Sequence, residues 1–189
     1  MRAAVLAFTW VAAVSSRAAG ANNDAGASPF ESRPTVIYAV LGAGAPLGLV
    51  GAEVERTILP NWSLSAGFGW GAANAPQGAA MIHWQGGGAY TKVTLGAGIS
   101  GGGYKWKEFC LDACANGPVT KSGTVAWGNL ELGVERRFSN GFVVRDFLGY
   151  GHVIAGNLVC DQPVNICGPY YQNDGYALIY LGGALGYSF

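Results

Sequence analysis

The sequence predicts an all-β chain that folds into an eight-stranded antiparallel transmembrane β-barrel. Three observations carry this prediction: an alternating apolar pattern at the end of the chain, a composition rich in apolar residues but poor in charge, and eight strand-like segments between turn signals. Half of the 189 residues are hydrophobic, 12% are charged and 31 are glycine, whereas a soluble domain has about 25% charged residues. The apolar residues alternate with small and polar ones, as expected for a barrel with lipid on its outside.

Residues 174–189 show the clearest strand pattern. Successive side chains of an extended chain point to opposite faces, so an apolar row at every second position predicts a strand. Leu185, Tyr187 and Phe189 end this row, and they resemble the C-terminal signal that the assembly machinery of bacterial outer-membrane β-barrels reads. The resemblance implies that this is the closing strand of a barrel and that the barrel-assembly machinery is a partner.

The first residues of the chain predict an exported protein. Residues 1–21 have a positive start, an apolar stretch over 3–14 and small residues before a cleavage site, which is the layout of a secretory signal peptide. The apolar stretch is too short to span a bilayer as a helix, and a buried N-terminal helix is the alternative. Residues 22–34 are small and polar, so we expect a flexible periplasmic segment there, followed by the barrel over 35–189.

Eight segments between turn signals have the composition and alternation of strands. Most exceed the roughly nine to eleven residues that a tilted membrane strand needs. An even number closes an antiparallel barrel with both chain ends on one side, and closure leaves no strand edge unpaired in lipid. The predicted strands are 35–44, 48–59, 62–72, 78–85, 90–103, 123–138, 142–155 and 174–189.

Two of these strands indicate which face meets lipid. Every second residue from Trp62 to Trp70 is apolar, and the residues between them are serine or glycine. The fifth strand shows the same alternation from Thr91 to Ile99. A soluble barrel such as a lipocalin would turn the apolar row inward, and this is the alternative. The signal peptide and the terminal Phe189 favour the membrane form.

The connections between the strands alternate in length. Tight reversals rich in residues that tolerate unusual φ values predict periplasmic turns, and the remaining connections fall at the opposite end, facing outward from the cell. Trp and Tyr residues near strand ends are expected at the two membrane interfaces. The predicted periplasmic turns are 59–61, 86–88 and 139–141, and the predicted outer connections are 45–47, 73–77, 104–122 and 156–173.

Several charged residues occupy the strand positions that the alternation turns toward the interior of the barrel. Eight strands leave an interior just filled by side chains, so these charges are expected to pair with one another and with bound water; a conduction or proton path is the alternative. A general diffusion porin is not expected from so narrow a barrel. Asp146 does not fit, because alternation places it on the lipid face unless a β-bulge shifts the register. The predicted lumen charge network consists of Glu53, Glu55, Lys92, Glu131, Glu135, Arg137 and Arg145.

All four cysteines lie in the two long outer connections. An exported protein passes an oxidising compartment, so disulfides are expected. Local bonds Cys110–Cys114 and Cys160–Cys167 would staple each loop, and bonds between the loops are the alternative. A metal site competes with these pairings, but neither loop contains a histidine and the spacing is not a paired C-x-x-C. We therefore predict no metal and no cofactor.

The histidines and the outer loops give little sign of catalysis. His83 lies beside Trp84 and His152 lies near the outer end of the seventh strand, and neither sits in a serine-bearing motif. We therefore predict no catalytic residues and no enzymatic activity. Aromatic and charged residues beside the cysteines, such as Trp106 and Tyr170, suit contact with an extracellular partner or lipopolysaccharide. The alternative is that they only anchor the barrel at the interface.

From about residue 35 to 189 the chain resembles the small outer-membrane β-barrel superfamily, of the OmpA/OmpX type. The resemblance implies the outer membrane of a Gram-negative bacterium and contact with outer-membrane lipids and lipopolysaccharide. The chain differs from full-length OmpA-like proteins in lacking a C-terminal peptidoglycan-binding domain, so no peptidoglycan contact is carried over. With 11 basic and 11 acidic residues, it offers no basic face for nucleic acid.

The expected function is a structural or adhesin-like role in the cell envelope, through disulfide-stapled outer loops. A narrow, porin-like channel or small-ligand carrier is the first alternative, because the inward charges would line any water path through the barrel. A lipid A-modifying enzyme is the second.

Overall fold

The computed structural model describes residues 28–71, 75–107, 120–160 and 177–189 of the chain. The described residues form one short helix, α2 (Pro29–Ser32), and eight strands. No helix among them is long and apolar enough to cross a membrane. The strands are β1 (Thr35–Ala45), β2 (Gly48–Leu59), β3 (Trp62–Trp70), β4 (Pro76–Gly87), β5 (Thr91–Lys107), β6 (Thr120–Arg137), β7 (Phe142–Cys160) and β8 (Ala177–Ser188).

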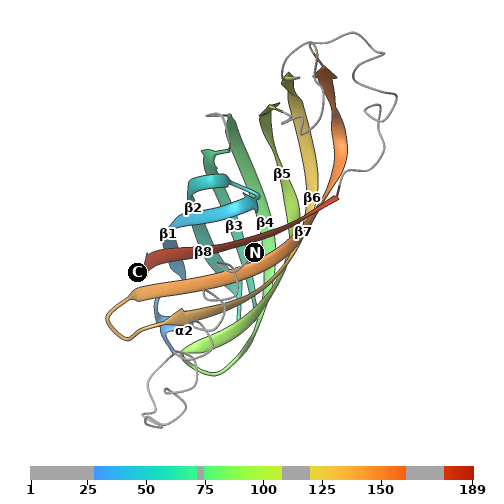
Figure 1. Ribbon diagram of the computed structural model, residues 1–189. Coiled ribbons are helices and arrows are strands. Elements are labelled where there is room, and N and C mark those ends of the chain that lie inside the picture. Colours follow the sequence, from blue (N-terminus) through green and yellow to red (C-terminus); the bar gives the residue numbers. More distant parts are fainter. Residues whose placement is uncertain (1–27, 72–74, 108–119, 161–176) are drawn as a thin grey trace, which may run out of the picture.

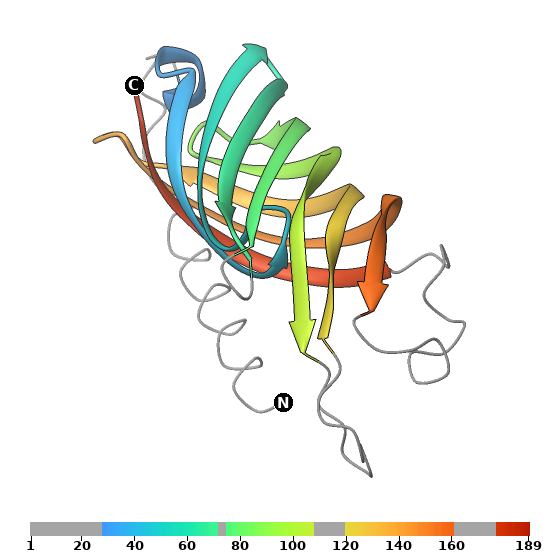
Figure 2. The same cartoon turned by 90° about the horizontal axis from the view of Figure 1, so that it is seen from above.

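The eight strands form one closed antiparallel sheet. Each strand pairs with its neighbour in the chain, and β8 pairs with β1 from Val36↔Ser188 to Ala43↔Leu181. Figures 1 and 2 show the strands tilted around a common interior. The predicted eight-stranded antiparallel barrel is confirmed.

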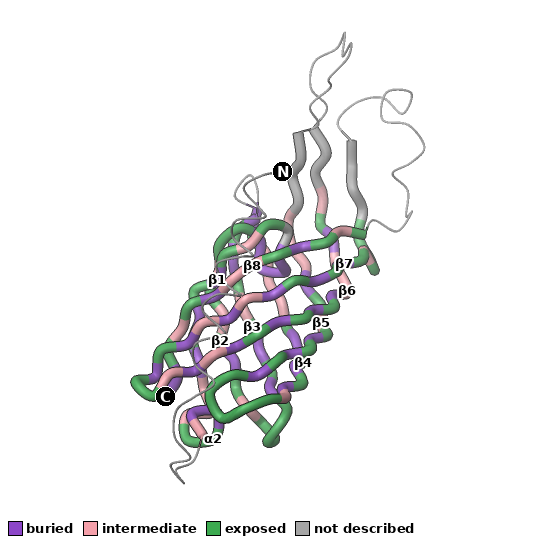
Figure 3. The backbone as a smooth tube through the Cα atoms, turned by 60° about the horizontal axis from the view of Figure 1, so that its bottom comes forward, coloured by how far each residue is buried: buried purple, intermediate pink, exposed green. Residues whose placement is uncertain are grey.

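Burial alternates along the strands with period two (Figure 3). On β8 the outward Ile179 is 77% exposed, whereas its neighbour Tyr180 is 1% exposed. On β3 the outward Phe68 is 49% exposed and the inward Ser63 is fully buried. Because the apolar row lies outside and the small polar row inside, the structure excludes the lipocalin-like alternative.

Three neighbouring strands are longer than the sequence predicts. β5, β6 and β7 contain 17, 18 and 19 residues, whereas the other strands contain 9 to 12. The predicted loop 104–122 is therefore shorter, since Lys105 pairs with Ser122 and Lys107 with Thr120. The apolar alternation fades here, but backbone pairing does not depend on it. These strands extend well beyond the rest of the barrel (Figure 1).

The connection between β1 and β2 does not project outward as predicted. Ala45 and Leu47 are each only 3% exposed. A Cβ atom on Gly51, an inward position of β2, would lie 2.9 Å from the Cβ of Leu47. The connection therefore bends into the lumen, where glycines on the inward rows of β2 and β3 leave room for the leucine side chain.

One further expectation needs correction, and the outward position that alternation predicts for Asp146 is confirmed. The part of the predicted flexible segment that the structure describes contains α2, and Phe30 in this helix is 1% exposed. Asp146 lies on the outward row of β7, half-buried, opposite Val134 and Gly183 without any register shift at that position. The bulge suggested for Asp146 is absent, and the register shift of the β6–β7 pair occurs instead between Ala126 and Trp127.

Candidate functional site

The charged residues that the sequence predicts to point into the barrel interior lie close together in the lumen. All seven of them point inward, and each is buried or nearly so. They come from β2, β5, β6 and β7, so the barrel closure itself makes them neighbours. Together with His83 of β4 they form what we call the lumen charge cluster: Glu53, Glu55, His83, Lys92, Glu131, Glu135, Arg137 and Arg145.

Arg145 connects β7 to the carboxylates of β2. Its Nη1 donates to Glu55 Oε2 at 2.8 Å and its Nη2 donates to Glu53 Oε1 at 2.8 Å. The guanidinium also lies over the ring of Tyr38, 4.5 Å from the centroid, and 5.8 Å from that of Phe147. A planar guanidinium suits this position because it forms charge-assisted hydrogen bonds in its plane and stacks on aromatic faces.

Arg137 occupies the end of the same cluster that lies nearest to α2. Its Nε donates to Glu135 Oε1 at 2.6 Å and its Nη2 to Glu55 Oε1 at 3.4 Å. Its Nη1 donates to the carbonyl oxygen of Arg33 at 2.9 Å, just after α2. The guanidinium carbon lies 4.3 Å from the centroid of the Phe30 ring. These contacts hold the N-terminal segment across the end of the barrel.

Lys92 reaches the same aromatic ring from β5. Its Nζ lies 4.3 Å from the centroid of Phe30 and donates to the carbonyl oxygen of Pro60 at 3.3 Å. Phe30 is therefore held between two cations, an arrangement that the ring quadrupole favours. Sequence reasoning missed this role, because a single aromatic residue in a polar segment carries no periodic signal.

His83 is the second member of the site that sequence reasoning missed. It is 1% exposed; its Nδ1 lies 3.7 Å from Glu55 Oε2 and its Nε2 lies 3.6 Å from Glu131 Oε1. The alternation that identified the inward glutamates also applies to β4, where Met81, His83 and Gln85 share the buried row. That signal was available in the sequence.

Gln85 completes the polar wall beside His83. Its Nε2 donates to Glu55 Oε1 at 2.9 Å and to Ser63 Oγ at 3.1 Å. Further along the lumen, Asn129 Nδ2 donates to Ser100 Oγ at 2.9 Å. Most of the buried polar side chains on β2 to β6 therefore contact one another across the interior.

The opposite side of the lumen is apolar. Tyr180 of β8 packs its ring against Gly149 of β7, where a Cβ atom would collide with it, and its hydroxyl donates to the carbonyl oxygen of Leu130 at 3.2 Å. The core cluster there consists of Val36, Tyr38, Val40, Ala45, Leu47, Val143, Phe147, Tyr180 and Ala184. The lumen is thus filled by charge pairs on one side and by an apolar core on the other.

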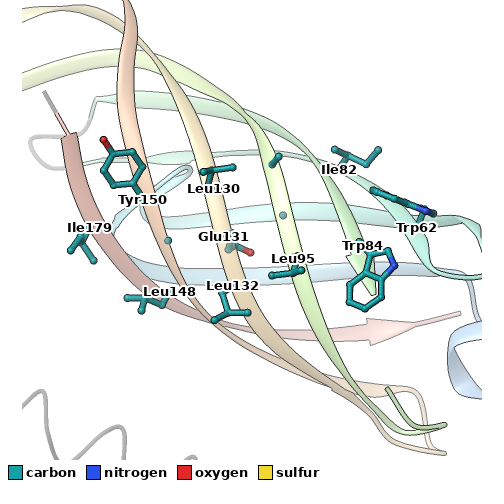
Figure 4. A pocket seen from close by; sticks show the side chains of 13 residues that line it. Trp62, Ile82, Trp84, Leu95, Leu130, Glu131, Leu132, Leu148, Tyr150 and Ile179 are labelled. Atoms are coloured by element: carbon teal, nitrogen blue, oxygen red, sulfur yellow. The ribbon is translucent and has the colours of Figure 1, made fainter. Parts of the chain in front are cut away.

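The outside of the barrel carries a shallow apolar groove of about 780 Å³. Figure 4 shows Trp62, Trp84, Leu95 and Ile179 among the side chains that line it, drawn from several adjacent strands. Glu131 borders the groove only from behind, since its side chain is buried in the lumen. No cluster of acidic, histidine or cysteine residues in the described part of the chain is arranged to hold a metal ion.

The remaining predicted residues lie elsewhere. Leu185, Tyr187 and Phe189 are 55 to 57% exposed on the outer face at the end of the chain. Cys160 ends β7. The other three cysteines lie outside the described residues, so both predicted disulfides do too.

Comparisons with known proteins add a fold relationship. No family profile and no curated protein matches the sequence. Among solved structures, the N-terminal β-barrel domain of Pseudomonas aeruginosa OprF matches with a TM-score of 0.53 at 13% identity, covering 83% of this chain and 98% of that one. This chain shares the fold of that barrel. Acinetobacter baumannii CarO matches with a TM-score of 0.47 at 14% identity over 82% of this chain and 98% of its own.

At 13% identity the likeness to the OprF domain extends to the fold and not to any activity. The chemistry of the site therefore has to be argued from the residues of this chain. Its lumen pairs opposite charges at close range and packs apolar side chains beside them.

Proposed function

We propose that this chain is a non-enzymatic integral protein of the Gram-negative outer membrane, with a structural or surface-interaction role through its outer loops. The observation that carries the proposal is the outward wall. Large apolar side chains are 37 to 77% exposed on all eight strands. Monomeric soluble proteins rarely expose contiguous apolar patches beyond a few hundred Å². Lipid is the solvent that matches such a wall.

Aromatic residues near the strand ends support a membrane position. Trp62, Trp70 and Tyr187 are 39 to 55% exposed on the outer face. Their amphipathic rings suit the two membrane–water interfaces, where they contact lipid headgroups and, in the outer leaflet, lipopolysaccharide.

The long strands support a role at the cell surface. The ends of β5, β6 and β7 from which the chain continues into residues 108–119 and 161–176 extend beyond the other strands (Figure 1). These connections and the end of β7 contain all four cysteines. We propose the local disulfides Cys110–Cys114 and Cys160–Cys167, which would stiffen both loops for contact with an extracellular partner, with bonds between the loops as the alternative.

The filled lumen argues against the channel alternative. Side chains of the lumen charge cluster pair across the interior, the β1–β2 connection bends inward, and Phe30 lies across one end. Purified barrel in planar bilayers should therefore give no steady conductance. Regular single-channel steps would favour the channel instead.

The environment of His83 supports a non-enzymatic role. Among the described residues, neither of its ring nitrogens has a hydrogen-bond partner, and its closest charged neighbours are carboxylates. A serine-type hydrolytic site would place a side-chain hydroxyl beside such a base. Lipid A from cells with and without the protein should give identical mass spectra; a new acylation pattern would favour the lipid-modifying alternative.

Membrane integration is tested by electrophoresis of outer-membrane fractions before and after boiling. A closed barrel should migrate differently when unheated. With both loop disulfides formed, reductant should shift the migration further, and Cys110→Ser or Cys160→Ser should abolish part of that shift. A periplasmic protein with no heat-dependent shift would contradict the membrane assignment.

Surface exposure of the loops is tested with an epitope inserted at position 113. Antibody should label intact cells carrying this insertion. The matched control places the same epitope after Asn140 in the β6–β7 turn, where labelling should require permeabilised cells. Equal labelling of both variants on intact cells would contradict the proposed orientation.

The barrel-assembly machinery is the proposed partner of the β8 end. Phe189→Ala should reduce the amount of heat-modifiable barrel in the membrane, because it removes the last outward aromatic side chain of the signal. Phe68→Ala is the control, since Phe68 is similarly exposed, at 49%, but lies on β3. Equal losses in both variants would indicate a general effect of lost apolar contact.

A further inference from the structure

The lumen charge cluster contains an imbalance of charge. Within the described residues its carboxylates are Glu53, Glu55, Glu131 and Glu135, whereas its permanent cations are Lys92, Arg137 and Arg145. Glu31 and Arg33 beside α2 add one charge of each sign. The cluster therefore has one negative charge more than its fixed cations neutralise. An uncompensated charge in a low-dielectric interior is strongly unfavourable.

His83 lies where the missing positive charge is needed. Its two ring nitrogens face different carboxylates, Glu55 at 3.7 Å and Glu131 at 3.6 Å. Both nitrogens and Glu131 Oε1 are buried without a hydrogen-bond partner among the described residues. Gly96 makes room for the imidazole, because a Cβ atom there would lie 2.6 Å from His83 Cδ2.

Two other ways of neutralising the charge fit the geometry less well. Glu55 accepts hydrogen bonds from Arg145, Arg137 and Gln85, so a proton bound to Glu55 would compete with these three donors. A metal ion between the carboxylates would need converging ligands. The two nitrogens of one imidazole point in different directions, so a single ion cannot use both.

We propose that His83 is a buried proton-binding site, doubly protonated at neutral pH, whose imidazolium balances the lumen charge cluster by bridging Glu55 and Glu131. A neutral imidazole has one N–H and can satisfy only one of these carboxylates. The inference concerns the lumen and does not depend on the role of the outer loops. The titratable and charged groups around His83 are Tyr38 of β1, Glu53 and Glu55 of β2, Lys92 of β5, Glu131, Glu135 and Arg137 of β6, Arg145 of β7 and Tyr180 of β8.

Nitrogen-15 NMR of the refolded barrel tests the proposal directly. The chain has two histidines, and His152→Asn assigns their signals. At pH 7.5 the His83 ring should show two protonated nitrogens, and the signals of His152, exposed on the outer face of β7, serve only for assignment. A neutral His83 ring at pH 7.5 would overturn the proposal. A His83 signal that changes on addition of EDTA would also overturn it, in favour of a bound metal.

Charge-balanced variants supply the second test. Glu131→Gln removes one carboxylate, so His83 should become neutral at pH 7.5, whereas Asp146→Asn, the same kind of change on the outward row of β7, should leave it protonated. His83→Gln should raise the unfolding equilibrium constant by at least about a hundredfold. Adding Glu131→Gln to His83→Gln restores the charge balance of the cluster and should recover most of the stability that His83→Gln loses. A double variant no more stable than His83→Gln would show that charge balance is not the role of His83.

Discussion

The two sides of the lumen differ in chemistry although they belong to one sheet. The inward rows of β1, β7 and β8 form an apolar core around Tyr38 and Tyr180, whereas those of β2 to β6 carry most of the buried polar and charged groups. Arg145 lies between the two sides, with Tyr38 on one face and the carboxylates of β2 at its edge. In this barrel both buried arginines, Arg137 and Arg145, contact a carboxylate and an aromatic ring at once.

Replacing Arg145, which lies between the charged and the apolar side of the lumen, should lower the free energy of unfolding most. Arg145→Met leaves Glu53 and Glu55 without their closest cation, and removing one partner of a buried pair costs about 3–5 kcal/mol. Urea unfolding in lipid vesicles measures this loss. Arg56→Met is the control, because Arg56 is exposed on the outward row of β2 and should change little. Equal losses in both variants would mean that the pairs with β2 contribute nothing specific.

The apolar side is tested at Leu47, which the β1–β2 connection turns into the lumen. Leu47→Ala should destabilise the barrel by about 2–4 kcal/mol, since it opens a cavity in the core. Leu41→Ala is the matched control, because Leu41 is 62% exposed on the outward row of β1. If the two variants unfold at the same urea concentration, the connection does not pack as described.

Replacing Phe30 tests whether its ring anchors α2 at the end of the barrel, beside Lys92 and Arg137. Phe30→Ala removes two cation–π contacts from Lys92 and Arg137 and should cost about 1–2 kcal/mol. Backbone amides near α2 should then exchange faster with solvent, while those of β4 keep their protection. Ser32→Ala is the control at an exposed position of the same helix. Unchanged exchange near α2 in Phe30→Ala would contradict an anchoring role for the ring.

Replacing Tyr180 by phenylalanine should have the smallest effect on the free energy of unfolding. Tyr180→Phe keeps the ring beside Gly149 and removes the hydroxyl that donates to the Leu130 carbonyl oxygen, so the free energy of unfolding should fall by about 1 kcal/mol. Tyr187→Phe, on the outer face, should have no comparable effect on urea unfolding. A loss of several kcal/mol in Tyr180→Phe would instead show that the hydroxyl contributes to the charged side.

Several features of the site were predictable because they follow from alternation along one strand. Glu55, Glu135 and Arg145 were assigned to the lumen by parity alone, and the structure places all three there, close enough for ion pairs. His83 obeys the same rule and was overlooked because its neighbours are apolar. Its partners, however, lie on β2 and β6, and no local pattern in β4 indicates which carboxylates it faces.

The amino-acid sequence by itself determined the strand number, the tight turns and the face that meets the outside, because these depend on side-chain periodicity within short segments. Only the tertiary structure decided that Leu47 turns inward, that Phe30 lies between two cations and that β5 to β7 extend beyond the other strands. These features rest on contacts between residues far apart in the chain, which exist only once β8 has closed the sheet against β1.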